Sequence, residues 1–417
     1  MDAIDIVTIL IVLASVFTFV NIHYIKLPST IGLMILAMAL SVTVVVGGYF
    51  WPALTEGAYD IMTTYDFSEI LLDIMLNFLL FAGALTVNLK KLREYRWTIF
   101  ILTIIGVLIS TFVVGYLTFL VLPWFGLELD FIYCLLFGAL ISPTDPIAVL
   151  AIMTKLNVSE NLEIKIAGES LFNDGVGVVI FLTILGVATA GVESVSVGSV
   201  AYLFGSEVFG GLILGSILGY IGFLLLKAID NKHTELEVLI TLSLVMLGAT
   251  ISEFFHFSGP LASVVTGLFI GNKGRSEELS GIAGEYVFKF WHLLDEALNA
   301  ILFILIGLQM IIVPFKPMYF AAGMLVILIA LFARWVSVGV PIAIISLFKP
   351  FEKHTIKLLT WGGLKGGISV ALALYLPDFE GKDLVVAITY SVVVFSIIFQ
   401  GLSIAPLLKW LYRNKKS

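Results

Sequence analysis

The stretch AGESLFNDGVGVVIF, from Ala167 to Phe181, places two carboxylates, an amide and a hydroxyl inside a long apolar run. A charged group at the centre of a bilayer costs about 2.5–3.5 kcal/mol on insertion scales. Ser170 and Asp174 are four residues apart, so they share one face of a helix, and Glu169 and Asn173 form an adjoining stripe. The stretch therefore predicts a membrane helix that holds a polar site.

The composition of the whole chain predicts a polytopic membrane protein. Apolar residues make up 60% of the 417 residues and charged residues 13%, whereas a soluble domain is about half apolar and one quarter charged. The single cysteine, Cys134, excludes an internal disulfide framework. No basic stripe favours nucleic acid as a partner. The first apolar run lacks a basic leader and a cleavage site, so we expect it to be retained as a helix.

Apolar runs of about 20 residues are long enough to cross the hydrocarbon core, and they give thirteen predicted spans. These cover 3–22, 29–50, 69–88, 97–122, 131–154, 162–186, 199–227, 236–254, 258–272, 285–313, 318–347, 355–376 and 383–410. The ninth run is short, which leaves twelve spans as the alternative. The loops are short, so we expect one all-α membrane domain over 1–417 and no soluble domain.

Basic residues in the loops indicate the orientation. Of the 23 Lys and Arg residues, only Lys316 and Lys382 fall on one side of the thirteen-span arrangement, and only Arg334 and Lys365 fall inside spans. The others share the opposite side. Because basic loops stay in the cytoplasm, we expect the N-terminus outside and the C-terminus in the cytoplasm. A twelve-span count would disrupt this alternation, so thirteen is favoured.

The fifth predicted span contains a helix break. It reads FGALISPTDPIAVLAIM over 137–153, where Pro143 and Pro146 flank Thr144 and Asp145. Each proline removes a backbone donor and clashes with the carbonyl one turn back. The sequence therefore predicts a discontinuous helix near these two prolines.

The twelfth predicted span contains a second break. It reads LLTWGGLKGGISVALAL over 358–374, with four glycines around Lys365. Irregular backbone at membrane depth is tolerated only where it is buried in protein or lines a cavity, and paired broken helices point to a transporter site. The breaks near 142–146 and 362–367 are seven spans apart, which fits an inverted repeat.

The polar groups of the fifth and sixth spans predict a site for a small cation. Hard cations such as Na⁺ prefer oxygen ligands. Ser170, Asn173 and Asp174 supply such oxygens, and the broken span adds free carbonyls near Thr144 and the Asp145 carboxylate. Asp174 can equally hold a proton. A cation and a proton that compete for one site, exposed alternately to each side, are sufficient for exchange.

The remaining buried charge, Glu169, needs a partner. Arg334 is the expected one, because guanidinium stays charged when buried and binds a carboxylate bidentately. Lys365 is the competing partner, and it could instead compensate carbonyls or dipoles at the second break. Snorkelling to an interface is the alternative for both basic residues. Near the start of the tenth span, Asp295 and its polar neighbours are expected to form a solvated funnel wall, with pH sensing as the alternative.

At these motifs the chain resembles the cation/proton antiporter superfamily, and within it the CPA1-type NhaP/NHE-like sodium/proton exchangers. The matching motifs are SPTDP at 142–146, GESLFNDG at 168–175 and GGLKGG at 362–367, together with the run LNAILFILIGL. The resemblance covers essentially the whole chain. It implies an inverted-repeat fold, a homodimer and elevator-like movement of a core. Core helices are then expected at about 69–186 and 285–376, with dimerisation helices between them and N-terminal helices at 3–50.

The resemblance also implies roles for individual residues. Family ligand roles carry over to Asp174 and Ser170 and to Thr144 and Asp145. The pair Asn173–Asp174 resembles the electroneutral type, which exchanges one cation for one proton, and the family's salt bridge would correspond to Glu169 and Arg334. No cofactor is expected, and the expected partners are the transported cation, protons, membrane lipid and a second copy of the chain.

The chain departs from the family pattern in three places. Ala82 stands where many relatives carry Glu, and Lys365 stands where arginine is common. The long regulatory tail of animal exchangers is missing, which is typical of a prokaryotic protein of the cytoplasmic (inner) membrane.

The missing carboxylate at Ala82 leaves the identity of the transported cation open. Exchange of Na⁺ or Li⁺ for H⁺ is the leading interpretation, and K⁺/H⁺ exchange is the alternative. A more distant alternative is an intramembrane aspartyl protease, although the typical GxGD sequence is absent.

Overall fold

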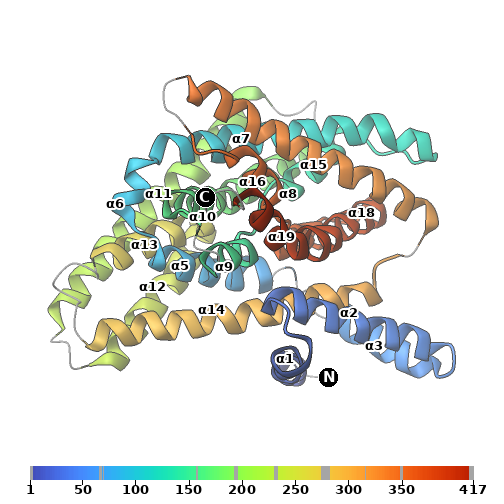
Figure 1. The fold of residues 1–417 in the computed structure, drawn as a ribbon, viewed down its shortest axis with the longest axis horizontal. Helices are drawn as coiled ribbons and strands as arrows, with labels where there is room; N and C mark the ends of the chain where they lie inside the picture. The colour runs from blue at the N-terminus through green and yellow to red at the C-terminus, as the bar shows by residue number, and fades with distance from the viewer. Residues whose placement is uncertain are drawn as a thin grey trace.

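The computed structural model (Figure 1) describes residues 3–64, 68, 70–155, 158–191, 196–229, 233–273, 282–314, 316–347 and 351–412. In this part of the chain every regular element is a helix, which confirms the predicted all-α class. Six of the basic residues that indicated the orientation lie outside the described residues: Lys232, Arg275, Lys349, Arg413, Lys415 and Lys416.

The helices follow the order of the predicted spans. They are α1 (Ala3–Val20), α2 (Ser29–Gly48), α3 (Pro52–Thr64), α5 (Leu76–Thr86), α6 (Leu89–Glu94), α7 (Arg96–Val121), α8 (Phe131–Ile141), α9 (Ile147–Lys155), α10 (Glu160–Ala190), α11 (Val197–Ala228), α12 (Thr234–Phe255), α13 (Gly259–Lys273), α14 (Ile282–Leu308), α15 (Pro317–Ser346), α16 (Thr355–Trp361), α17 (Gly367–Tyr375), α18 (Lys382–Phe395) and α19 (Gly401–Tyr412). Short π-helical segments precede α5 (Ile70–Met75) and α19 (Ser396–Gln400).

Nine helical segments of the described chain are long and apolar enough to cross a membrane. The other four predicted spans contain shorter or interrupted helices, at 70–86, 131–155, 259–273 and 355–375. Helices α3 and α6 were not predicted, and both lie between predicted spans. Each predicted span therefore contains helix, while the number of membrane crossings stays a prediction.

Local sequence explains where the central helix, α10, begins and ends. The Ser159 hydroxyl accepts a hydrogen bond from the Leu162 amide at 3.4 Å, and Glu160 and Glu163 occupy the first turn, where acidic side chains favour the helix dipole. The helix ends before Gly191, whose φ of +87° suits glycine. The polar stretch 169–174 therefore lies in the middle of a continuous α-helix.

Both predicted helix breaks are present. Helix α8 ends at Ile141 and α9 begins at Ile147, while α16 ends at Trp361 and α17 begins at Gly367. The two breaks meet, because the Asp145 amide donates a hydrogen bond to the Leu364 carbonyl at 2.8 Å in an isolated antiparallel bridge. An inverted repeat accounts for the presence of two breaks, one in each half of the chain. The bridge between Asp145 and Leu364 brings the two breaks together.

The helices pack as two groups. In the first group, α5 packs on α13, α13 on α11, and α14 on α2. In the second group, α7 packs on α8 and α15, α15 on α18, and α10 on α7 and α8. Figure 1 shows α14 with α1 and α2 along the lower side, and α7 and α15 along the upper side.

The predicted division into core and dimerisation helices stays a prediction, although these packing groups differ from its boundaries. The prediction assigned 69–88 and 285–313 to the ion-binding core, but α5 and α14 pack chiefly with the first group. It also omitted the last helices, whereas α18 packs on α15 in the second group. Hydropathy locates each helix along the chain, but contacts between distant helices decide which ones pack together.

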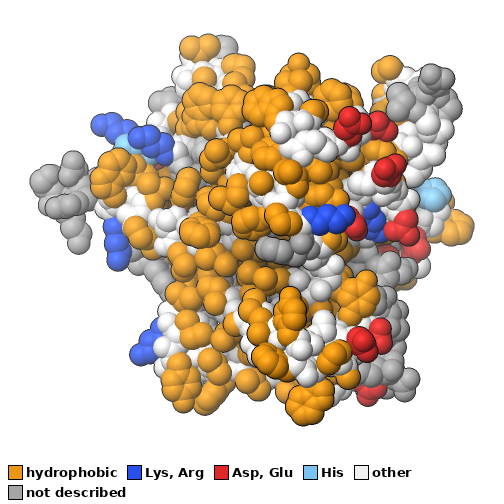
Figure 2. Space-filling model, turned by 90° about the vertical axis from the view of Figure 1, so that its right-hand side faces the viewer, with side chains coloured by type: hydrophobic (Ala, Val, Ile, Leu, Met, Phe, Trp, Pro, Cys, Tyr) orange, Lys and Arg blue, Asp and Glu red, His pale blue; other side chains and the backbone are white. Residues whose placement is uncertain are grey.

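The surface is rich in exposed hydrophobic side chains. Figure 2 shows a broad hydrophobic area, with most Lys and Arg side chains toward one edge and Asp and Glu side chains toward the other. Phe112 and Leu328 are examples of large side chains that are more than half exposed. An apolar surface of this extent is typical of a protein that contacts lipid, so the chain is an integral membrane protein.

Candidate cation-binding site

Asn173 of α10 forms hydrogen bonds with the first helix break. The side-chain oxygen of Asn173 accepts from the Thr144 amide at 3.3 Å, and its Nδ2 donates to Thr144 Oγ1 at 2.8 Å and to Glu169 Oε1 at 3.0 Å. Asn173 is fully buried and is not among the residues that line the neighbouring cavity. The predicted contribution of Asn173 to cation binding stays a prediction, while in this structure its amide satisfies backbone and side-chain groups of the break.

Hydroxyl and carboxylate groups of the break lie close to α10. Thr144 Oγ1 is 3.2 Å from Ser170 Oγ, and either atom can donate. Asp145 Oδ1 accepts from the Ile147 amide at 2.9 Å and so caps the beginning of α9. Unwinding the chain between the two prolines thus brings Thr144, Asp145 and Ser170 to one place.

A cavity of about 180 Å³ lies beside these residues, between the two helix groups. Asp174, Asp145, Thr144 and Ser170 all line it, as do apolar side chains of α5 and the Leu302 side chain of α14. Asp174 is 8% exposed and makes no side-chain hydrogen bond to another described residue. A nearly enclosed carboxylate that accepts no hydrogen bond from a described side chain is suited to hold a cation or a proton.

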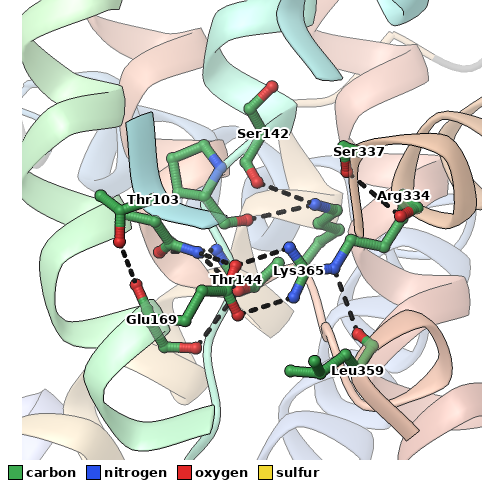
Figure 3. A network of polar contacts seen from close by, with 11 residues as sticks. Thr103, Ser142, Thr144, Glu169, Arg334, Ser337, Leu359 and Lys365 are labelled. Atoms are coloured by element: carbon green, nitrogen blue, oxygen red, sulfur yellow. Dashed lines mark hydrogen bonds and ion pairs between the residues drawn. The ribbon is translucent and has the colours of Figure 1, made fainter. Parts of the chain in front are cut away.

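Glu169, by contrast, has a strong partner (Figure 3). Arg334 Nη1 and Nη2 donate to the two carboxylate oxygens of Glu169 at 2.7 and 2.8 Å, and Arg334 Nε donates to the Leu359 carbonyl at 3.2 Å. Both side chains of this bidentate pair are buried. The pair joins α10 to α15 and, through Leu359, to α16. The Glu169 charge is therefore neutralised within the protein.

Lys365 makes contacts that neither prediction described. Its Nζ donates to the carbonyls of Ser142 and Pro143 at 3.1 and 3.3 Å, and its backbone amide donates to Ser396 Oγ at 2.8 Å. The Lys365 ammonium therefore forms no ion pair with Glu169, and it does not bond to carbonyls of the second break, in which Lys365 itself lies. It satisfies carbonyls that the first break leaves without helical donors.

Four more polar residues line the cavity, one of them Thr86 of α5. Asp295 and Asn299 of α14 lie there, linked by a hydrogen bond from Asn299 Nδ2 to Asp295 Oδ1 at 3.1 Å. The sequence placed them in a solvated wall. Ser369 of α17 was missed entirely. It is 1% exposed, and its hydroxyl has no partner among the described residues. Its position two residues after Gly367 at the second break was the only available signal.

Ala82 does not contribute to this cavity. It is buried on α5 in a separate apolar cluster that includes Phe81 and Trp291. No cluster of three or more His, Cys, Asp or Glu side chains in the described chain is close enough to hold a metal ion. The cavity therefore combines separated carboxylates with hydroxyl groups and the free backbone of the break.

The family model for the transmembrane sodium/hydrogen exchanger matches residues 9–410, nearly the whole chain. The chain belongs to the sodium/hydrogen exchanger family. This membership agrees with the resemblance seen at the two breaks and at the polar stretch of α10, and it places the protein among transporters.

Two bacterial antiporters match this chain over more than nine tenths of their length. The Na⁺/H⁺ antiporter NhaP of Pseudomonas aeruginosa is 46% identical, covering 99% of this chain and 97% of that protein. The antiporter NhaH of Halobacillus dabanensis is 32% identical, covering 92% of each chain. The solved structure of MjNhaP1 from Methanocaldococcus jannaschii at pH 8 superposes with a TM-score of 0.78 at 22% identity, covering 98% of each chain. This chain and MjNhaP1 therefore share one fold despite their low sequence identity.

Proposed function

We propose that this protein is a secondary antiporter that exchanges Na⁺ for H⁺, one for one, by alternating access. The observation that carries this proposal is Asp174, an almost enclosed carboxylate in a cavity between two helix groups, with no side-chain hydrogen bond to a described residue. The names of the Na⁺/H⁺ antiporters NhaP and NhaH support the choice of ions.

In the proposed binding step, the cation exchanges water for protein oxygens. Asp174 supplies the charge, and Thr144, Asp145 and Ser170 line the same cavity. A sodium ion gains oxygen ligands of the kind that hard cations prefer. Three carboxylates, Asp145, Asp174 and Asp295, line the approach and favour cations over anions.

The proposed release step depends on competition at Asp174. When a proton binds the carboxylate, the negative charge that held the cation is lost, and the cation leaves. When a cation binds, the proton leaves. A site that reaches each side of the membrane in turn then couples the two gradients, because each occupied form excludes the other.

The surrounding charges support a ratio of one to one. Glu169 and Arg334 neutralise each other, and the Lys365 ammonium donates to two carbonyls. Asp145 caps α9. Asp174 is thus the one carboxylate at the helix crossing, the place where the two breaks meet beside α10, for which the described residues supply no such partner. If only Asp174 changes its occupant during a cycle, one Na⁺ replaces one H⁺ and no net charge moves.

Several finer points belong to the same proposal. Li⁺ shares the preference for oxygen ligands and would be carried as well, and K⁺/H⁺ exchange is the alternative within the fold. A homodimer in the prokaryotic cytoplasmic membrane, with its N-terminus outside, fits the basic loops and the family resemblance. Cation efflux driven by proton entry would be the physiological direction.

A reconstituted flux assay tests the proposal. Purified protein is placed in proteoliposomes with a pH-sensitive dye, and gradients of Na⁺, Li⁺ or K⁺ are imposed. We expect Na⁺ to move protons, and the rate to be unchanged when valinomycin and K⁺ clamp the membrane potential. Proton movement with K⁺ alone would select the alternative. A cation-driven current without proton movement would contradict exchange.

A further inference from the structure

A second, larger cavity lies away from the cation site. It has a volume of about 670 Å³ and is formed by α2, the segment that follows α14, α15, α18 and the π-helical segment after α18. This size falls within the range of about 300–1,000 Å³ that is typical of pockets for lipid- or drug-sized molecules. The cavity touches both helix groups, because α2 belongs to the first and α15 and α18 to the second.

The lining is almost wholly apolar and opens toward the lipid-facing surface. Valines of α2, methionines of α2 and α15, and phenylalanines of α15 and α18 form the walls. Val46, Met324 and Phe399 line the cavity and are each more than half exposed. Because these exposed side chains belong to membrane helices, hydrocarbon from the bilayer can enter directly.

Two polar groups distinguish this cavity from a plain apolar gap. Lys316 lies on its lining at the beginning of α15, where Nζ donates to Tyr319 Oη at 3.2 Å and lies over the same ring. No carboxylate of a described residue is within ion-pair distance of Lys316, whereas Lys382 pairs with Asp378. Tyr390 lines the cavity with 8% exposure, and its hydroxyl has no partner among the described residues.

We propose that this cavity binds one phospholipid, with an acyl chain against α2, α15 and α18 and the phosphate on Lys316. An apolar space with a cation at one end matches the two parts of such a molecule. The Lys316 ammonium gives the phosphate a charge-assisted contact, and the Tyr390 hydroxyl is available as a donor to an ester oxygen. This inference is independent of the proposed transport function, because it concerns binding alone.

Native mass spectrometry of the purified protein tests the inference. Protein in mild detergent is incubated with phosphatidylglycerol, and retained lipid is counted for wild type, Lys316→Gln, Ala387→Trp and the control Lys382→Gln. Ala387 lines the cavity, so a tryptophan there fills it. We expect one retained lipid for wild type and the control, none for Ala387→Trp, and about fivefold weaker retention for Lys316→Gln, since one lysine near anionic lipid contributes that much.

Each other outcome overturns the inference. Retention that is equal in wild type and Ala387→Trp would place the lipid elsewhere. Should Ala387→Trp not fold, Ser391→Leu serves as a milder filling variant, and unchanged retention there would have the same meaning. Equal affinity of wild type and Lys316→Gln for phosphatidylglycerol would remove the phosphate contact. A cavity-filling variant that turns a dimer into a monomer would instead assign the cavity to a second copy of the chain.

Discussion

Asp174 differs from its charged neighbours because no described residue offers it a hydrogen bond. We predict that Asp174→Asn abolishes exchange, since the amide can neither release a proton nor balance a cation. The measurement is sodium-driven proton flux in proteoliposomes. Glu380→Gln, a change outside the cavity and the helix crossing, is the control and should retain wild-type flux. Sodium-dependent proton flux at the wild-type rate in Asp174→Asn would exclude this carboxylate as the carrier.

The Glu169–Arg334 pair leads to a stability prediction. Removing one partner of a buried ion pair costs about 3–5 kcal/mol, because the other charge stays buried without compensation. We therefore expect Arg334→Ala to lower the melting temperature in detergent sharply. Adding Glu169→Gln should recover part of the loss, since it removes the orphaned charge.

The exposed pair Lys382–Asp378 provides the matched control. It joins residues four apart on the surface, where such pairs contribute about 0–1 kcal/mol, so Lys382→Ala should change the melting temperature little. A double variant of Arg334 and Glu169 that melts no higher than Arg334→Ala alone would show that the two charges are not coupled in the folded protein.

At the residue scale, the sequence predicted those contacts that depend on helical spacing or on charge. Ser170 and Asp174 line one cavity because they lie four apart on α10. Arg334 meets Glu169 because few charges are buried and these two attract. Asn173 also lies within the polar stretch, but its rotation on α10 turns it toward Thr144 and Glu169. Helical spacing placed Asn173 on the same stripe as Glu169, but it did not predict that the amide of Asn173 would bond to Thr144.

At the scale of elements, Lys365 holds one broken helix to the other. Its ammonium reaches the Ser142 and Pro143 carbonyls from the second break. We predict that Lys365→Met lowers stability by about 1.5–3 kcal/mol, the value of a hydrogen bond to a charged group, and also slows exchange because the crossing loses its geometry. Melting temperature and flux are measured together.

The comparison with Lys365→Arg isolates the role of charge at this crossing. Arginine keeps the charge but has a planar donor group, so we expect a smaller loss than for methionine. If Lys365→Met had the melting temperature and flux of wild type, the hydrogen bonds from Lys365 to the Ser142 and Pro143 carbonyls would not stabilise the protein.

The helix breaks themselves were predictable, because proline and glycine act locally. What the breaks touch was not predictable. Lys365 and Ser142 are 223 residues apart, and the bridge between Asp145 and Leu364 forms only when both spans are in place. The same reason explains why Ser369 was missed, since its place in the cavity depends on the position of the other helix group.

At the scale of the whole molecule, two helix groups meet at the cation cavity, and the proposed exchange requires them to move relative to each other. A β-carbon added at Gly401, at the beginning of α19 and after α18 of the second group, would touch the Ile31 side chain of α2, away from the cavity. We predict that a disulfide between Ile31→Cys and Gly401→Cys blocks exchange at least about tenfold and that reduction restores it. The only native cysteine, Cys134, is buried.

A disulfide within one group is the control. Asn77 and Ser263 are linked by a side-chain hydrogen bond of 3.1 Å between α5 and α13 of the first group. Cysteines at these two positions should leave exchange near the level of their reduced form. Unimpaired exchange in the oxidised Ile31–Gly401 variant would mean that the groups do not need to move at this contact.

Competition at Asp174 can be measured directly as sodium affinity against pH in purified protein. When one proton and one Na⁺ exclude each other, the apparent dissociation constant for Na⁺ rises about tenfold for each pH unit of acidification in the range where the site is protonated. It levels off at higher pH, where the site is free of protons. We predict this dependence for wild type and no measurable Na⁺ binding for Asp174→Asn. A sodium affinity that stays constant from acid to alkaline pH would contradict the proposed mechanism.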